Sequence, residues 1–137
     1  MTINKSIIRQ ISFNSHGDDR GELVALEIAK EIPFDVKRVY YIFHTAKGVS
    51  RGFHAHRSLK QVLVAVSGSV RVHYECINGQ RGEVILSSPT CGLYIEGLVW
   101  RELHDFSSDA VSLVIADKIY DEGDYIRSYD NFILEKK

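Results

Sequence analysis

Two histidines, His54 and His56, are the side chains of this sequence best suited to chemistry. They lie two positions apart in a stretch with strand character, and because side chains alternate along a strand, both imidazoles are expected on one face. An imidazole pair can begin a metal site, or it can move protons, since an unperturbed histidine pKa of about 6.5 lies close to neutral pH. The residues around the pair are needed to distinguish these two uses.

The stretch from Gly48 to Gly68 resembles the first motif of the cupin superfamily, in which a His-x-His pair and a metal-binding glutamate lie between two glycines. Gln61 stands at the glutamate position, and an amide is a poor ligand for zinc, iron or manganese. In the stretch that matches the second motif, Trp100 stands where a ligating histidine is usual. The resemblance therefore implies a site without a metal ion, in which the histidines are free to move protons.

Short strands separated by turn signals must position this pair. Besides the histidine strand, we expect strands over Ser6 to Phe13, Leu23 to Ile28, Lys37 to His44, Gln61 to Val66, Val70 to Cys76, Glu83 to Leu86, Leu93 to Ile95, Trp100 to Phe106 and Ala110 to Ala116. Only the tail, Tyr120 to Leu134, could carry a short helical turn. This pattern is typical of an all-β sandwich or barrel. The cupin resemblance implies a double-stranded β-helix, or jelly roll, with a short C-terminal extension.

Composition limits the partners that this protein can have. The 137 residues are expected to form a single domain, 1–137, with its core over roughly 7–132. A net charge of −1 and a pI of about 6.6 predict neither a nucleic-acid nor a membrane partner. Cys76 and Cys91 are too few for a disulfide framework, and no apolar run approaches the length of a membrane span. We therefore expect a soluble, cytoplasmic protein.

Several segments together resemble the dTDP-4-keto-6-deoxyglucose 3,4-ketoisomerases, which are cupins without a metal. The likeness covers nearly the whole chain and is carried by Arg51 to His56, Arg38 to Phe43, Gly92 to Tyr94, His104 to Ser107 and Tyr120 to Phe132. It implies a cytoplasmic homodimer that isomerises a dTDP-linked 4-keto-6-deoxy sugar and uses no cofactor. The product would serve deoxyamino sugar biosynthesis, as for lipopolysaccharide O-antigen.

The reaction requires a base that takes the proton from C3 and a second group that moves protons between the two sugar oxygens. We assign His54 to the carbon and His56 to the oxygens; the reverse assignment stays open. Tyr40 shares a face of its strand with Arg38 and is the candidate donor to the enediolate. The sequence leaves open whether the C4 hydroxyl of the product is axial or equatorial.

Binding of the nucleotide diphosphate calls for arginines, because guanidinium groups match phosphate oxygens. Arg38 and Arg51 are the expected clamps, while Gln61 and Trp100 are expected near the sugar. The segment Asp18 to Gly21 resembles an element of related 3,5-epimerases in which the arginine, here Arg20, meets the phosphates. The other histidines are expected at surface or structural positions: His16, His44, His73 and His104.

Two rival hypotheses remain at this point. The first is a cupin that binds a sugar nucleotide without catalysis, as a regulator or an accessory subunit. The second is a metal-dependent cupin isomerase or oxygenase.

Overall fold

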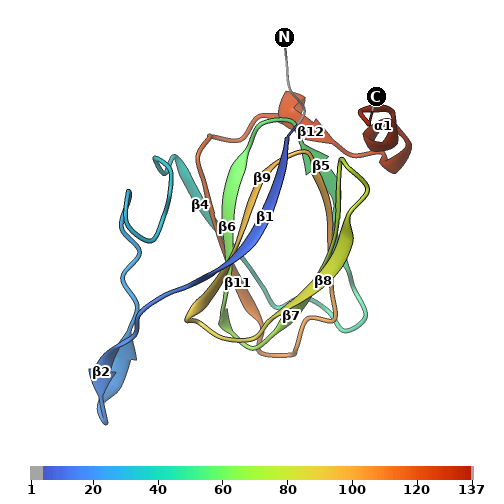
Figure 1. The fold of residues 1–137 in the computed structure, drawn as a ribbon. Helices are drawn as coiled ribbons and strands as arrows, with labels where there is room; N and C mark the ends of the chain where they lie inside the picture. The colour runs from blue at the N-terminus through green and yellow to red at the C-terminus, as the bar shows by residue number, and fades with distance from the viewer. Residues whose placement is uncertain (1–4, 137) are drawn as a thin grey trace.

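The computed structural model describes residues 5–136, and strands dominate them (Figure 1). The strands are β1 (Ser6–Ser12), β2 (His16–Asp18), β3 (Gly21–Leu23), β4 (Arg38–Phe43), β5 (Arg51–His56), β6 (Lys60–Ser67), β7 (Val70–Cys76), β8 (Arg81–Leu86), β9 (Cys91–Gly97), β10 (Val99–His104), β11 (Val111–Ala116) and β12 (Tyr125–Ile126). A 3₁₀ turn, η1 (Glu122–Asp124), and a short helix, α1 (Tyr129–Leu134), complete the chain.

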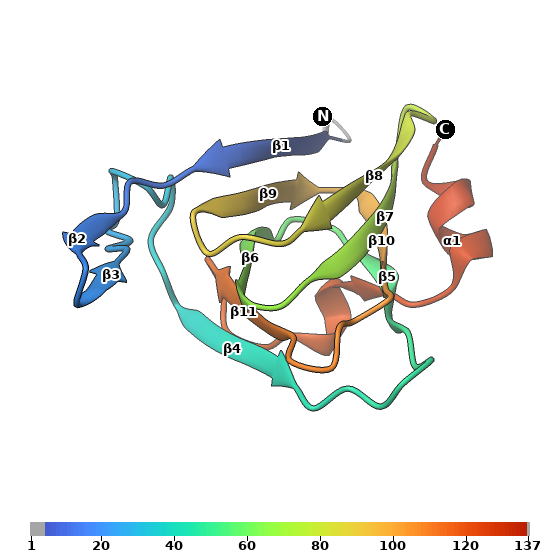
Figure 2. The same cartoon turned by 90° about the horizontal axis from the view of Figure 1, so that it is seen from below.

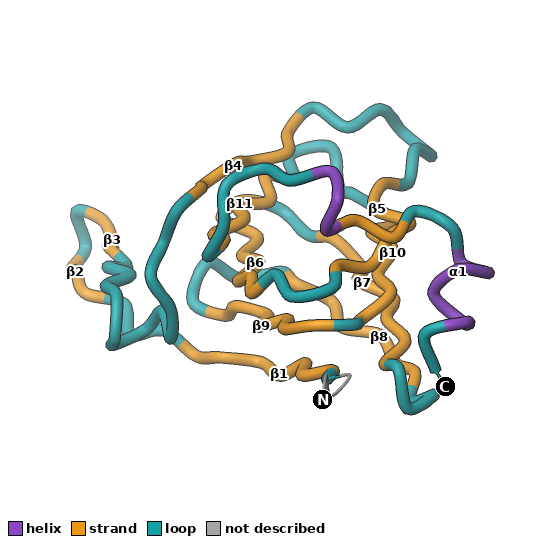
Figure 3. The backbone as a smooth tube through the Cα atoms, turned by 90° about the horizontal axis from the view of Figure 1, so that it is seen from above, coloured by secondary structure: helices purple, strands orange, loops and turns teal. Residues whose placement is uncertain are grey.

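The barrel consists of two sheets with the strand orders β1-β9-β6-β11-β4 and β12-β5-β10-β7-β8. All neighbouring strands within these sheets pair antiparallel. Figures 2 and 3 show the strands enclosing a common interior, with β1 and β4 at opposite edges of the first sheet. The prediction of an all-β jelly roll is confirmed.

Alternating strands place an apolar core between the sheets. On β7, Val70 and Val72 are buried, whereas His73 on the other face is half-buried. Full burial of such an aliphatic side chain contributes about 1.5–3 kcal/mol. Ile42, Leu63, Leu103 and Val114 belong to this core or pack against it, and they also form part of the wall of a cavity.

The C-terminal extension packs back onto β5. Phe132 of α1 is fully buried against Trp100 and Ile126. The side chain of Ser128 caps the helix by accepting a hydrogen bond from the backbone N–H of Asn131. These contacts confirm the predicted short helical turn, and they fix η1 and β12 beside the histidine strand.

The predicted strand from Leu23 to Ile28 is wrong. β3 ends at Leu23, and β2 and β3 form a small hairpin that projects from the barrel (Figure 1). Ile28 makes only an isolated bridge with Ile32. Val24 and Leu26 are nevertheless partly buried against the outer side of the first sheet. Their apolar pattern therefore reflects packing without strand pairing.

Within residues 5–136, none of the helices has the length and apolar character needed to cross a membrane.

Candidate active site

The histidine pair lies on β5, where a bulge bends the strand. Gly52 has a φ of +87° and Phe53 a φ of +58°, and the pairing of β5 with β10 shifts register between Arg101 and Glu102. A positive φ costs most residues energy but is open to glycine, so Gly52 permits the bend. Beyond the bulge, the rings of His54 and His56 lie together with centroids 4.8 Å apart.

His54 lines a cavity between the two sheets, whereas His56 is buried behind it with 1% of its surface exposed. Tyr125 of β12 lies against both rings, with centroid distances of 5.1 Å to His54 and 4.3 Å to His56. Oδ2 of Asp124 lies 3.3 Å from Nδ1 of His56, although these two atoms make no aligned hydrogen bond within the described residues. Only His54 of the pair thus faces the space that a ligand would fill.

Burial keeps both imidazoles neutral. It lowers the pKa of His54 to about 3, and the positive charge of Arg101 adds to this effect. The pKa of His56 is lowered further, by burial first and by Arg101 second. A neutral imidazole is the form that accepts a proton, so His54 is in its basic form at neutral pH, although the same burial makes it a weaker base.

Tyr40 is held by a chain of hydrogen bonds that starts at Arg101. Nη1 of Arg101 donates to Oε1 of Gln61 at 2.6 Å, and Nε2 of Gln61 donates to the Tyr40 hydroxyl oxygen at 3.1 Å. Because the phenolic oxygen is the acceptor here, its own proton remains available for a group in the cavity. Burial raises the pKa of Tyr40, so the hydroxyl keeps that proton at neutral pH.

Arg101 is a component of the site that the sequence analysis missed. It is almost completely buried, its Nε donates to the backbone carbonyl of Val99, and its Nη2 finds no partner among residues 5–136. Burial lowers its pKa to about 10, which still leaves a cation at neutral pH. The sequence did contain a signal for Arg101. Side chains alternate along a strand, and Arg101 lies between Val99 and Leu103 on the inward face of β10.

More arginines line the cavity, which has a volume of about 570 Å³. This volume falls in the usual range of small-molecule sites, about 300–1,000 Å³. The guanidinium group of Arg38 lies over the rings of Tyr40 and Tyr120, and that of Arg127 lies 4.2 Å from the centre of Tyr125. The charged and polar side chains of the wall are Arg38, Tyr40, Ser50, Arg51, His54, Gln61, Arg101, Tyr120, Tyr125 and Arg127.

Two residues predicted to contact the substrate, Trp100 and Arg20, lie outside the cavity wall. Trp100 points to the opposite side of β10, where it packs against Tyr129 and Phe132 and donates to Glu102. Arg20 lies in the projecting hairpin, where its side chain is 87% exposed and pairs with Asp18. The structure therefore brings together all of the other predicted site residues except His56, which supports the cavity wall from behind.

A neutral base, a phenol that can donate and several cations equip this cavity for proton transfer on an anionic substrate. In fold and site, the molecule is a cupin-type acid–base enzyme. The particular group follows from sequence comparison: the chain belongs to the FdtA family, described as WxcM-like, C-terminal, whose sequence profile matches residues 6–137.

Relatives of known function agree with this assignment. The chain is 55% identical over 122 residues to a TDP-4-oxo-6-deoxy-alpha-D-glucose-3,4-oxoisomerase from Aneurinibacillus thermoaerophilus, a match that covers 89% of this chain and 87% of the relative. A 3,4-ketoisomerase from Helicobacter canadensis superposes with a TM-score of 0.90 and 41% identity, over 94% of this chain and 96% of the other.

QdtA, a sugar 3,4-ketoisomerase from Thermoanaerobacterium thermosaccharolyticum solved in complex with TDP, gives a TM-score of 0.90 and 43% identity, over 94% of this chain and 93% of that structure. The predicted family and the predicted fold are thus confirmed.

Proposed function

We propose that this protein catalyses the 3,4-ketoisomerisation of a dTDP-4-keto-6-deoxyhexose to the dTDP-3-keto-6-deoxyhexose. The observation that carries the proposal is the neutral His54 on the wall of a cavity that also holds Tyr40. The named activities of the relatives support the same reaction. They also disfavour the rival hypothesis of a binding protein without catalysis.

The reaction proceeds through an enediolate. His54 takes the proton from C3, the electrons of the C–H bond form a double bond between C3 and C4, and negative charge develops on the C4 oxygen. Tyr40 donates to that oxygen, and the cationic Arg101 nearby stabilises the charge. The C4 oxygen then gains a proton as the C3 hydroxyl loses one, and the carbonyl forms at C3 when protonated His54 delivers its proton to C4. C3 is oxidised and C4 reduced within one molecule, so no redox cofactor is consumed.

The positions of the two histidines favour one of the two assignments. His54 is the one that lines the cavity, so we propose it as the base at carbon. His56 lies behind it, near Asp124 and Tyr125. We retain His56 as the second proton carrier; because it does not line the cavity, any proton that it exchanges with the substrate would pass through His54.

Arg38 and Arg51 are proposed to bind the pyrophosphate, because both line the cavity and guanidinium groups bind phosphate oxygens in pairs. Gln61 contributes by orienting Tyr40. Trp100 has no place in this proposal, since its ring packs beneath α1.

The proposal includes a cytoplasmic homodimer. The outer side of the edge strand β4 exposes Val39, Tyr41 and Phe43 by 54%, 62% and 52%, and exposed apolar edge strands are commonly covered by a partner. Arg20 does not line the cavity of its own chain, so its predicted contact with the phosphates would require the cavity of a second copy. Cys76 and Cys91 are free thiols, as expected in a reducing compartment.

Exchange of the sugar protons in heavy water tests the function. We expect the wild type, incubated with dTDP-4-keto-6-deoxyglucose, to introduce deuterium into the ring and to form the 3-keto product. His54→Asn should lower turnover by at least about 100-fold, because general base catalysis contributes about 10²–10⁴-fold. NMR spectroscopy follows both the exchange and the stereochemistry at C4.

His73→Asn is the matched control, because His73 lies outside the cavity wall; it should keep wild-type turnover. Full turnover in His54→Asn would refute the role of His54. If the wild type binds the sugar nucleotide but exchanges none of its ring protons for deuterium, the proposed enzymatic activity is refuted.

A further inference from the structure

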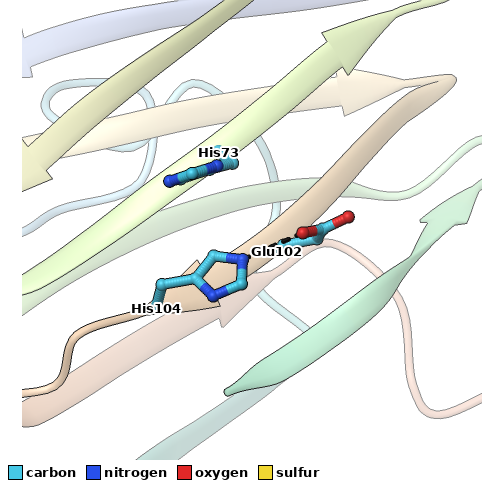
Figure 4. Close-up of side chains that lie close together, drawn as sticks. All are labelled: His73, Glu102 and His104. Atoms are coloured by element: carbon cyan, nitrogen blue, oxygen red, sulfur yellow. Dashed lines mark hydrogen bonds and ion pairs between the residues drawn. The ribbon is translucent and has the colours of Figure 1, made fainter. Parts of the chain in front are cut away.

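A second group of chemically capable side chains lies on the outer face of the sheet β12-β5-β10-β7-β8. His73 of β7 is directly opposite Glu102 of β10, and His104 follows two positions after Glu102 (Figure 4). One potential ligand atom from each of the three residues lies within 4.8 Å of the other two. From the sequence, His73 and His104 were expected at isolated surface or structural positions, because only the pairing of β7 with β10 brings them together.

The three side chains are a ligand set that borderline metal ions favour. Two imidazoles and one carboxylate bind zinc, with ligand bonds of about 2.0–2.2 Å. Oε1 of Glu102 and Nε2 of His104 are 2.9 Å apart, and the rings of His73 and His104 have centroids 4.6 Å apart. Bringing all three onto one ion requires side-chain rotation, and each of the three side chains is partly exposed.

Neighbouring groups already orient two of these side chains, as second-layer partners do in metal sites. Nδ1 of His104 lies 2.7 Å from the hydroxyl oxygen of Ser50. A serine hydroxyl can accept as well as donate, so it fits the tautomer in which Nε2 of His104 is free to bind an ion. The indole N–H of Trp100 donates to Oε2 of Glu102 at 2.9 Å, which leaves Oε1 facing the histidines.

The surroundings are favourable for a cation. A groove of about 450 Å³ adjoins His73 and Glu102, and its wall also includes Glu75 and Glu83. Oε1 of Glu83 is 3.6 Å from Nε2 of His73, close enough for Glu83 to supply a fourth ligand after a small movement. Two guanidinium groups on this face are paired with carboxylates: Arg71 lies near Glu83 and Asp105, and Arg81 of the groove wall pairs with Glu75.

We propose that His73, Glu102 and His104 form a binding site for a divalent transition-metal ion of the zinc class. None of the three residues lines the isomerase cavity, because side chains alternate across β10: Arg101 and Leu103 face the cavity, whereas Glu102 and His104 face outward. The two sites adjoin at Ser50, which lines the cavity and lies beside His104. A bound ion joins β7 to β10 and stabilises the sheet by linkage, since it binds the folded chain.

Titration of the full-length, chelator-treated protein with Zn²⁺ tests the proposal by calorimetry, and Co²⁺ gives a visible absorption spectrum that reports its ligands. We expect one ion per chain and a higher melting temperature with Zn²⁺. His73→Asn, His104→Asn and Glu102→Gln should each weaken binding by more than about tenfold, because each removes a ligand.

Two matched substitutions leave the site intact. His16→Asn removes a histidine of the projecting hairpin, and His54→Asn removes the other place where an imidazole pair could hold the ion; both should bind Zn²⁺ as the wild type does. Absence of saturable binding in the wild type would overturn the proposal. Binding that His54→Asn abolishes and His104→Asn preserves would overturn it as well.

A measurement on the wild type covers the case in which a variant fails to fold. Bound Co²⁺ should broaden or shift the ring-proton NMR signals of His73 and His104 and leave those of His16 unchanged. The opposite pattern would refute the site.

Discussion

At the residue scale, the amide of Gln61 sets the direction of the hydrogen bonds around Tyr40. Arg101 can only donate, so the carbonyl oxygen of Gln61 faces it and the NH₂ group faces Tyr40. A carboxylate at this position would accept from both neighbours, and the phenol would then give its proton to the protein. An amide leaves that proton for the substrate.

Gln61→Glu is therefore expected to lower kcat by at least about tenfold with a smaller change in KM, because loss of a donor to a developing oxyanion costs about 10²–10³-fold in rate. Steady-state kinetics on the dTDP-4-keto sugar measures both constants. The control is Gln80→Glu, at an exposed turn, which should behave as the wild type does. An unchanged kcat in Gln61→Glu would contradict the role given to Tyr40.

The residue types also show what the sequence could and could not reveal about the site. His54, His56 and Tyr40 were predicted from the His-x-His spacing, from strand alternation and from the family resemblance. His54 and Tyr40 line the cavity, whereas His56 lies behind it. Arg101 was missed because motif spacing directed attention to Trp100, one position away. Which of two adjacent residues points inward depends on strand register, and a pattern match does not supply that register.

At the scale of elements, the alternation of β4 was predicted correctly. Arg38, Tyr40 and Ile42 line the cavity, and the residues between them face outward. Leu23 to Ile28 failed because an apolar segment can pack on a sheet without pairing to it. The bulge on β5 could not be predicted either, since it arises where β5 meets β10 and those strands lie far apart in the sequence.

The bulge depends on Gly52, so Gly52→Ala should destabilise the fold by about 1–3 kcal/mol, the usual cost of a strained backbone position. An added Cβ would lie 3.0 Å from the carbonyl oxygen of Arg101 and 3.1 Å from Leu103. Urea denaturation measures the loss. Activity should fall as well, because His54 follows the bulge.

Gly79→Ala distinguishes the cost of a positive φ from the cost of a steric clash with neighbouring atoms. Gly79 also has a positive φ, +93°, but an added Cβ there meets nothing within 4 Å. It should cost less stability than Gly52→Ala and leave activity intact. Equal losses in the two variants would show that close approach of β10 has no part in fixing Gly52.

At the scale of the whole molecule, the two sheets have different outer faces. The outer face that carries the proposed metal site is polar and charged around His73, whereas the outer side of β4 is apolar. We therefore place the interface of the proposed homodimer on the apolar outer side of β4.

The double substitution Tyr41→Asp and Phe43→Asp should convert the dimer to a monomer, because it places charges in an apolar interface. Light scattering after size-exclusion chromatography gives the molar mass. Ile85→Asp is the control, since Ile85 is similarly exposed, at 61%, on the other sheet; it should leave the dimer intact. A wild type that is monomeric at micromolar concentration would refute the dimer.

The contact between Tyr125 and the histidine rings has a consequence for the order in which the protein is made. The strand with the histidines leaves the ribosome early, but the ring that covers them belongs to residues 120–136, which are synthesised much later and are anchored by Phe132, by the pair Arg57–Glu135 and by the pair Lys136–Glu75. A nascent chain that has not yet reached this segment lacks the ring that packs against the histidine pair. The cavity wall that Tyr125 contributes is therefore complete only after residues 120–136 have been synthesised.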